Sequence, residues 1–391
     1  APLLGALPRA ATVLPAFLGR DLQSLAITML ACSTLHAEGG VVVAALSKEV
    51  TRSLQEPEAS ARFSAQNLAN VSLALARVAA TPPSAAGQAA CAEALRAVAG
   101  HIADVADCQG GGWPAALPQH LSNVAWALAY AGANGAASAS ASAGSAERQR
   151  ALCVVRAESL HRLREFNTQA LSNTAWAFAR MAWDDESAGA TSGSFAEALA
   201  AASAKVRAWP ETQHLATVAW ALARLAVVDE EGPGRAFWTK FSLELSAGGA
   251  ISRCRSRELV ASSMAAAIGG VLHGALAGAI GAEARSRLEG GALAAGASSF
   301  RERLRAASGL SWAFATAAQA DAELFAVAER VALEELRHGG AAADVLDGDN
   351  VKSLLGLSWA FAFAHEDGAG GKVPQAVLTA LCAAAAARDA E

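Results

Sequence analysis

The stretch TQALSNTAWAFARM, residues 168–181, decides how this chain folds, because variants of it recur along the whole sequence. The strongest variants are FSAQNLANVSLALARV from Phe63, LPQHLSNVAWALAYAG from Leu117 and ETQHLATVAWALARLA from Glu211. Weaker variants begin at Asp21, Ser256, Arg303 and Val351. Aligning all copies gives one column, here called the Trp column, that reads Leu30, Leu73, Trp126, Trp176, Trp220, Ala265, Trp312 and Trp359.

The Trp column recurs at a nearly constant interval. Leu30 and Trp359 are 329 residues and seven steps apart, a mean of 47 residues per step. Repetition at a fixed period of this length indicates stacked repeats that share one continuous core. Hydrophobic residues make up 53% of the chain, mostly Ala, Leu and Val, and β-branched runs are scarce, which favours helices. We therefore expect an all-α chain, a right-handed α-solenoid of about eight helix pairs spanning residues 1–391.

Each repeat is expected to hold two helices, with the recurrent motif on the second. The segments before the motifs also have helical patterns. They are residues 41–54, 89–105, 146–163, 195–209, 235–245, 276–288 and 320–337. Residues 133–145 (ANGAASASASAGS) are predicted to be a low-complexity loop, and residues 374–388 a helix that caps the array.

Composition and charge exclude several function classes. A net charge of −5 counts against a strongly electrostatic grip on nucleic acid, although a local basic stripe remains compatible with it. Residues 259–282 carry no charge, but their Gly, Ala and Ser content favours a buried helix, a break and a second helix over a membrane span. The six cysteines are scattered singly, which is typical of buried thiols in a reducing compartment. No phosphate-binding loop, nucleophile elbow or metal-ligating motif is present in the sequence, so we expect no catalysis, cofactor or metal.

The candidate binding residues lie opposite the apolar face of the motif helix. At 100° per residue, Leu121 and Leu128 share the apolar face, whereas Gln119, Asn123 and Tyr130 point the other way. We name these three positions the Gln, Asn and Arg columns. Their other members in the strong copies are Gln66, Asn70 and Arg77; Gln169, Asn173 and Arg180; and Gln213, Thr217 and Arg224. Stacked repeats would align them into a stripe whose amides, guanidinium groups and ring suit base edges, phosphates and base stacking.

Each of these positions also has a purely structural explanation. A first-turn Gln can bond to free backbone amides, and a recurrent Asn can bond to the neighbouring repeat. The arginines of the Arg column can be plain solvated charges, and the tryptophans of the Trp column are predicted to pack in the core or between repeats. The segment 146–163 and Arg164 after it are basic, and form either a phosphate track or a solvated face through Arg148, Arg150, Arg156, His161, Arg162 and Arg164.

The strings QALSNTAWAFARM, QHLSNVAWALAYAG and QHLATVAWALARL resemble the second helix of the octotricopeptide repeat, a family related to arrays in RAP-domain proteins. The resemblance implies a helix-pair solenoid, import into a mitochondrion or chloroplast, and binding of organellar transcripts to control their stability, processing or translation. Some related arrays are structural subunits of organellar ribosomes. Residues 1–20 contain Arg9 and Arg20 and no acid, which suits either a targeting remnant or the first helix of the first repeat.

The sequence thus predicts a soluble, non-catalytic organellar protein that holds single-stranded or ribosomal RNA along the Gln, Asn and Arg columns, with other proteins of a ribonucleoprotein complex as further partners. The alternative is a protein-binding scaffold, such as a structural subunit of an organellar ribosome or another large assembly.

Overall fold

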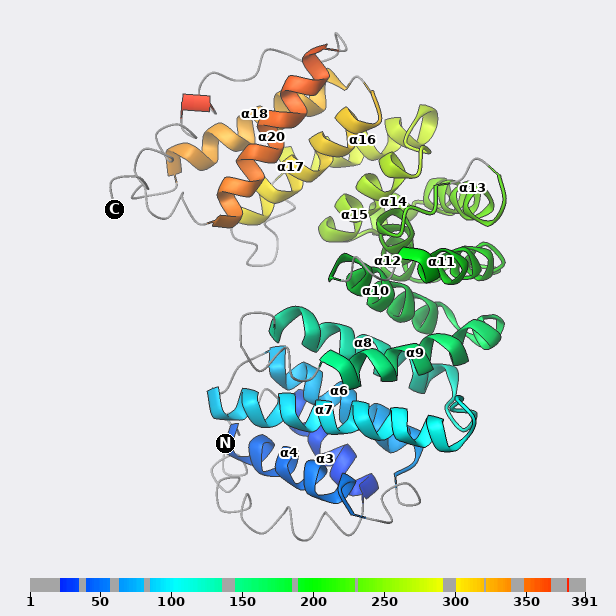
Figure 1. Cartoon of the computed structure of the whole chain (residues 1–391). Coiled ribbons are helices and arrows are strands. Elements are labelled where there is room, and N and C mark those ends of the chain that lie inside the picture. Colours follow the sequence, from blue (N-terminus) through cyan, green and yellow to red (C-terminus); the bar gives the residue numbers. More distant parts are fainter. Residues whose placement is uncertain are drawn as a thin grey trace. The chain divides into compact units, whose positions relative to one another are not determined.

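The computed structural model describes residues 22–34, 40–56, 63–80, 85–135, 145–184, 189–228, 231–290, 300–319, 321–338, 348–366 and 378–379. Within these residues every regular element is a helix and no strand occurs, which confirms the predicted all-α class for this part of the chain (Figure 1). The chain forms two compact units, Ala1–Leu199 and Ala200–Glu391, called unit 1 and unit 2 below.

Unit 1 contains two series of helices, one formed by the second helices of the pairs and one formed by the first helices. The second helices of the pairs are α3 (Leu22–Thr34), α6 (Ala65–Ala80), α8 (Pro118–Gly135) and α10 (Thr168–Asp184), and each packs against the next. The first helices, α4 (Gly40–Leu54), α7 (Ala85–Cys108) and α9 (Ser145–Arg162), form their own series in the same way. The short helix η2 (Leu163–Glu165) follows α9, and α11 (Gly189–Ala204) crosses the boundary between the units.

Unit 2 repeats this arrangement. Its second helices are α12 (Thr212–Arg224), α15 (Ser256–Ile268), α17 (Phe300–Thr316) and α20 (Gly348–Glu366), and each packs against the next. Its first helices are α13 (Pro233–Ser246), α16 (Gly274–Glu289) and α18 (Ala322–His338), with the short α14 (Ala250–Arg253) between α13 and α15. Packing of each helix on its counterpart in the next pair is the pattern expected of a solenoid.

Local sequence explains where the motif helices begin. The Ser64 side chain accepts the backbone N–H of Asn67 at 3.2 Å, and Asn167 Oδ1 accepts that of Ala170 at 2.8 Å. Both residues therefore act as N-caps that satisfy a free donor of the first turn. Pro118 opens α8, where its missing N–H costs no hydrogen bond. The starts of α6, α8 and α10 are thus fixed by residues that precede the apolar pattern or open it.

The apolar face predicted by the helical wheel is the core. Leu121, Val124, Ala125 and Leu128 of α8 are almost completely buried. The equivalent residues of α12, namely Leu215, Val218, Ala219 and Leu222, are buried in the same way. Small Ala side chains beside these large ones let neighbouring helices approach closely. The repeated pattern therefore sets which face of every second helix points inwards.

Most predicted first helices agree with the structure, with one clear error. The helix predicted over residues 195–209 ends at Ala204, and Trp209 lies buried in the loop that follows. The uncharged stretch 259–282 is interrupted as predicted, because α15 ends at Ile268 and α16 begins at Gly274. Gly270 (φ 69°) and Gly274 (φ 54°) adopt the left-handed conformation at this break. Among the described helices, none has the length and apolar character needed to cross a bilayer.

Two predicted segments lie largely outside the described residues. Of the loop predicted over residues 133–145, positions 133–135 continue α8 and Ser145 begins α9, while 136–144 are not described. Of the capping helix predicted over residues 374–388, only 378–379 are described.

Candidate functional site

The Gln, Asn and Arg columns lie at the surface of the second helices. Gln66, Gln119, Gln169 and Gln213 are exposed. Asn70, Asn123, Asn173 and Thr217 are half-buried. In the Arg column, Arg77 and Arg224 are exposed, whereas Tyr130 and Arg180 are half-buried. In unit 1 the three columns therefore share one face of α6, α8 and α10, and in unit 2 they share the equivalent face of α12.

The structural explanations for the amide columns find little support among the described residues. None of the Gln66, Gln119, Gln169, Asn70, Asn123 or Asn173 side chains has a hydrogen-bond partner there. In α6 and α10, a free backbone N–H group of the first turn donates instead to the N-cap side chain, Ser64 or Asn167. Thr217 differs from the Asn residues, because its hydroxyl donates to the Gln213 carbonyl at 2.7 Å. In unit 1 the amides are therefore available to a ligand.

The tryptophans of the Trp column are less buried than the sequence predicted. Trp126 and Trp176 contact each other across neighbouring helices, with ring centroids 6.0 Å apart, as inter-repeat packing requires. Both are nevertheless half-buried, and Trp359 is 44% exposed. The helical wheel contained this signal, because Trp126 lies only about 20° from the direction of Gln119. The Trp column thus belongs to the same face as the three polar columns.

A flat side chain four residues later stacks on most of these tryptophans. Tyr130 stacks on Trp126 at 4.9 Å between ring centroids, and Phe363 stacks on Trp359 at 5.0 Å. The guanidinium groups of Arg180 and Arg224 lie over Trp176 and Trp220, at 5.8 and 5.0 Å from the ring centroids. Cation–π contact and ring stacking hold each Trp in one orientation before any ligand arrives.

In unit 1 these contacts join into one aromatic cluster. Tyr130 lies 6.3 Å from Trp176 as well as against Trp126, so three rings and the Arg180 guanidinium group form a continuous surface over α8 and α10. Among the described residues, neither Arg77 nor Arg180 pairs with a carboxylate. Flat groups, cations and unpaired amides on one face are the side chains used to bind unstacked bases and phosphates.

In α15 the columns are shifted by one residue from the sequence alignment. α12 and α15 each span 13 residues, and aligning them from their first residues pairs Trp220 with Met264. Met264 is half-buried like Trp220, whereas Ala265 is 1% exposed. Glu258 is buried and accepts hydrogen bonds from Thr212 Oγ1 at 2.7 Å and from the Arg255 backbone N–H at 3.0 Å. Glu258 therefore links α12 to α15, and the exposed first-turn position is Arg257.

The basic helix α9 is a weaker phosphate track than its sequence suggested. Arg150 pairs with Asp104 and Asp107 of α7, at 3.1 and 2.6 Å. Arg162 is bound by Glu165 at 2.7 Å and lies 3.5 Å from Glu158. Two of the five arginines thus have carboxylate partners. Arg150 connects α9 to α7, and Arg162 binds Glu165 at the end of α9, so both have a structural role.

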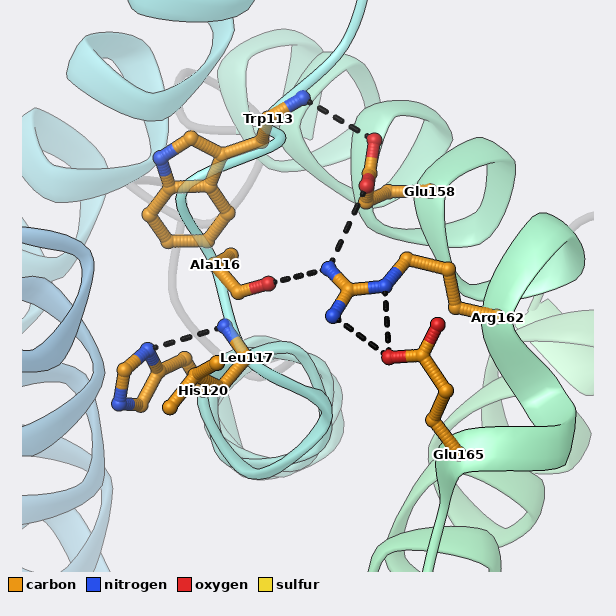
Figure 2. A network of polar contacts seen from close by, with 7 residues as sticks. All are labelled: Trp113, Ala116, Leu117, His120, Glu158, Arg162 and Glu165. Atoms are coloured by element: carbon orange, nitrogen blue, oxygen red, sulfur yellow. Dashed lines mark hydrogen bonds and ion pairs between the residues drawn. The ribbon is translucent and has the colours of Figure 1, made fainter.

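Figure 2 shows how Arg162 fixes the loop that leads into α8. Arg162 Nη1 donates to the Ala116 carbonyl at 2.6 Å, while Glu158 accepts the backbone N–H of the buried Trp113 at 3.3 Å. The hydrogen bond between Arg162 and Glu165 raises the pKa of the guanidinium group and lowers the pKa of the carboxyl. The network holds the residues just before Gln119, and so positions the start of the stripe.

His120 completes this helix start. Its Nδ1 accepts the backbone N–H of Leu117 at 3.2 Å, which requires that nitrogen to be unprotonated. Burial lowers the pKa of His120 and so favours the neutral ring. Nothing in the sequence indicates this role, because the histidines are dispersed along the chain.

Other chemistry is limited in the part of the chain that the structure describes. Cys91 and Cys254 are buried free thiols, as predicted, but Cys108 and Cys153 are exposed. The described His, Cys, Asp and Glu residues form no group of three or more that could hold a metal ion. A scan against protein-family models finds no matching family, and a search of curated proteins finds no matching relative.

Proposed function

We propose that this chain binds single-stranded RNA along the exposed face of its second helices, without catalysing a reaction. The columns of unit 1 would contact RNA through Gln66, Asn70, Arg77, Gln119, Asn123, Tyr130, Gln169, Asn173 and Arg180. In unit 2, the equivalent face of α12 would contact RNA through Gln213, Thr217 and Arg224. The protein would form a right-handed array of about eight helix pairs. Its resemblance to the octotricopeptide repeat supports a role in the stability, processing or translation of organellar transcripts, or a contact with ribosomal RNA.

The observation that carries this proposal is the aromatic cluster of unit 1 beside the free amides. Trp126, Tyr130 and Trp176 offer partly exposed rings, each held by a neighbour. Asn123 and Asn173 lie on the same face with no hydrogen-bond partner among the described residues. Buried structural amides would be paired, and a purely structural aromatic cluster would be covered. A ligand with flat apolar faces and polar edges matches both sets of groups.

The proposed mechanism is occupancy. The aromatic and guanidinium groups hold one another by stacking and cation–π contact, so binding costs little side-chain entropy. A strand held in this way is shielded from nucleases or kept in an extended form for neighbouring factors. No step of this mechanism requires a nucleophile, a general base or a metal.

The test is binding of defined RNA oligonucleotides to the full chain and to a triple variant, Arg77→Ala, Arg180→Ala and Arg224→Ala. We expect the variant to lose affinity and the slope of log affinity against log salt to fall by about 2, because three phosphate contacts are lost. A charge-matched control replaces three exposed cations outside the stripe and outside α9, Lys48, Arg235 and Arg253, with Ala. Equal affinity and equal slope for both variants would contradict the proposal.

A protein-binding scaffold is the second candidate. It is supported by the net charge of −5 and by exposed apolar side chains on the first helices, such as Leu243 of α13 at 66% exposure. If the native chain bound no oligonucleotide at low salt but was retained in a protein assembly at high salt, this candidate would replace the RNA proposal. A salt-insensitive interaction is expected for an apolar protein interface.

A further inference from the structure

From α15 onwards, the stripe of unit 2 changes its chemistry. The first-turn position becomes basic, as Arg257, Arg305 and Lys352; all three residues are exposed, and Arg257 also forms an ion pair with Glu302 of α17 at 2.6 Å. The Trp column continues as Met264, Trp312 and Trp359. The last column becomes largely apolar, as Ile268, Thr316 and Phe363. These nine residues are called the unit 2 line below.

The amides of unit 1 have no counterpart in the unit 2 line. Ala261, Gly309 and Gly356 stand where α6, α8 and α10 have Asn. A Cβ on Gly309 would lie 2.6 Å from Val260 Cγ1, and one on Gly356 would lie 2.8 Å from Ser308 Oγ. The glycines therefore allow close helix approach, which a larger side chain would prevent. No group in this column of α15, α17 or α20 can read the hydrogen-bonding edge of a base.

The remaining groups recur as one cation and one flat or polarisable side chain per repeat. In each helix the cation precedes the Trp-column residue by seven positions, which is two helical turns or about 10.5 Å along the axis. Trp312 and Trp359 stack across neighbouring helices at 6.2 Å between centroids, and Phe363 extends the surface. A single-stranded nucleic acid shows the same alternation of charge and flat surface, because each nucleotide carries one phosphate and one flat base.

We propose that the unit 2 line holds single-stranded RNA irrespective of its base sequence, whereas the Asn column of unit 1 discriminates between bases. The inference rests on the proposed function, since it divides RNA binding between the two units. Arg257, Arg305 and Lys352 contact phosphates, and Trp312 and Trp359 stack on bases. Stacking tolerates any base because every base has a flat face.

The first experiment compares oligonucleotides of twelve uridines, twelve adenosines and twelve cytidines on the full chain. Replacing Arg257, Arg305 and Lys352 together with Gln should weaken all three by the same factor and lower the salt slope by about 2. Replacing Asn70, Asn123 and Asn173 with Ala should instead change the ratio between the oligonucleotides. A charge-matched control replaces Arg235, Arg253 and Arg330, exposed cations of unit 2 outside the line, with Gln.

The second experiment needs no substitution, so it does not depend on the variants folding. Bromouridine oligonucleotides are crosslinked by ultraviolet light to the native chain, and crosslinked peptides are mapped. Crosslinks at Trp312 and Trp359, in addition to α8 and α10, are the expected result. Each Trp→Ala change should then weaken binding about five- to hundredfold for every oligonucleotide.

The outcomes separate the two proposals. If no oligonucleotide binds or crosslinks, the proposed function fails and this inference fails with it. If RNA binds but crosslinks are confined to unit 1, and the unit 2 variants match their control, only the inference is overturned. The unit 2 line would then suit another ligand, such as an acidic amphipathic segment of a protein. A changed base preference in the Arg257, Arg305 and Lys352 variant would also overturn it.

Discussion

Single residues of the second helices have sharply different roles although they are close in sequence. Leu121 is fully buried, Gln119 two positions earlier is exposed, and Trp126 is half-buried on the same side as Gln119. The 100° step of the helix produces this alternation. Substitutions at neighbouring positions should therefore separate the stability of the fold from ligand binding.

Leu121→Ala tests the core role. Removing a fully buried Leu should destabilise the fold by about 2–5 kcal/mol, because apolar contact is lost and a cavity remains. Denaturant unfolding monitored by circular dichroism measures this change. The control is Gln119→Ala on the same helix, which should alter stability by less than about 0.5 kcal/mol. Similar losses for both variants would contradict the assignment of the two faces.

His101 gives stability a pH dependence. Burial lowers the pKa of His101 from 6.5, with a smaller opposing contribution from Asp104. As the pH falls, the unfolded chain therefore binds this proton before the folded chain does, and stability declines from about pH 6.5 down to the folded pKa. His101→Phe keeps a ring against Phe63, which lies 6.0 Å away, but removes the titration.

The measurement is the unfolding midpoint at pH 7 and pH 5. The difference between these values should be smaller for His101→Phe than for the unmodified chain. Burial also lowers the pKa of His120 and His214, so part of the pH dependence should persist. An unchanged difference would show that His101 is not held neutral by the fold.

At the scale of elements, a cation from one first helix repeatedly anchors the loop of the preceding pair. Lys240 of α13 donates to the Arg207 carbonyl at 3.2 Å, and Arg287 of α16 donates to the Cys254 carbonyl at 2.6 Å. In unit 1, Arg162 of α9 makes the corresponding bond to Ala116. Each bond holds a loop that leads into the second helix of the preceding pair, so a first helix helps to determine where that second helix starts.

Arg162→Ala tests this anchoring. Leaving the Ala116 carbonyl and Glu158 without their partner should cost about 1–3 kcal/mol. Backbone amides of residues 109–117 should exchange hydrogen faster, because the loop loses its attachment to α9. Arg164→Ala is the matched control, since Arg164 is exposed on the neighbouring turn. Unaltered exchange in the loop of the Arg162 variant would refute the anchoring role.

The sequence predicted the helices better than it predicted the site. Spacing of Ala and Leu along the motif fixes which face is buried, and this is a local property of one helix. The contact between Trp126 and Trp176 depends on how closely two helices approach, which no single helix reveals. The one-residue shift that places Met264 at the Trp position could not be predicted, because α15 contains no Trp. Its run of Ser, Ala and Met does not show by itself which residue aligns with Trp220. The anchoring role of Arg162 could not be predicted for a related reason, since the carbonyl that it binds, that of Ala116, belongs to the preceding repeat.

At the scale of the whole molecule, contacts are made between neighbours in the helix order. Within unit 1, α8 packs on α6 and α10, and within unit 2, α17 packs on α15 and α20. Stability is then close to a sum of local terms, and a defect is felt mainly by adjacent helices. The two compact units should therefore respond independently to local damage.

Hydrogen exchange measured on Leu121→Ala tests this independence. Protection should fall in α6, α8 and α10, which share the damaged core, and remain unchanged in α17 and α18 of unit 2. Mass spectrometry of exchanged peptides resolves these regions in the intact chain. A uniform loss of protection across both units would indicate a single cooperative structure instead.

The backward direction of the loop anchors makes the chain asymmetric. Lys240 and Arg287 both donate to carbonyl groups of residues that come earlier in the sequence. Trimming a terminal pair from the carboxyl side would release the loop before it, whereas trimming from the amino side would leave every later anchor intact. Loss of helix pairs, by proteolysis or during evolution, should thus proceed more easily from the carboxyl end of the array than from its amino end.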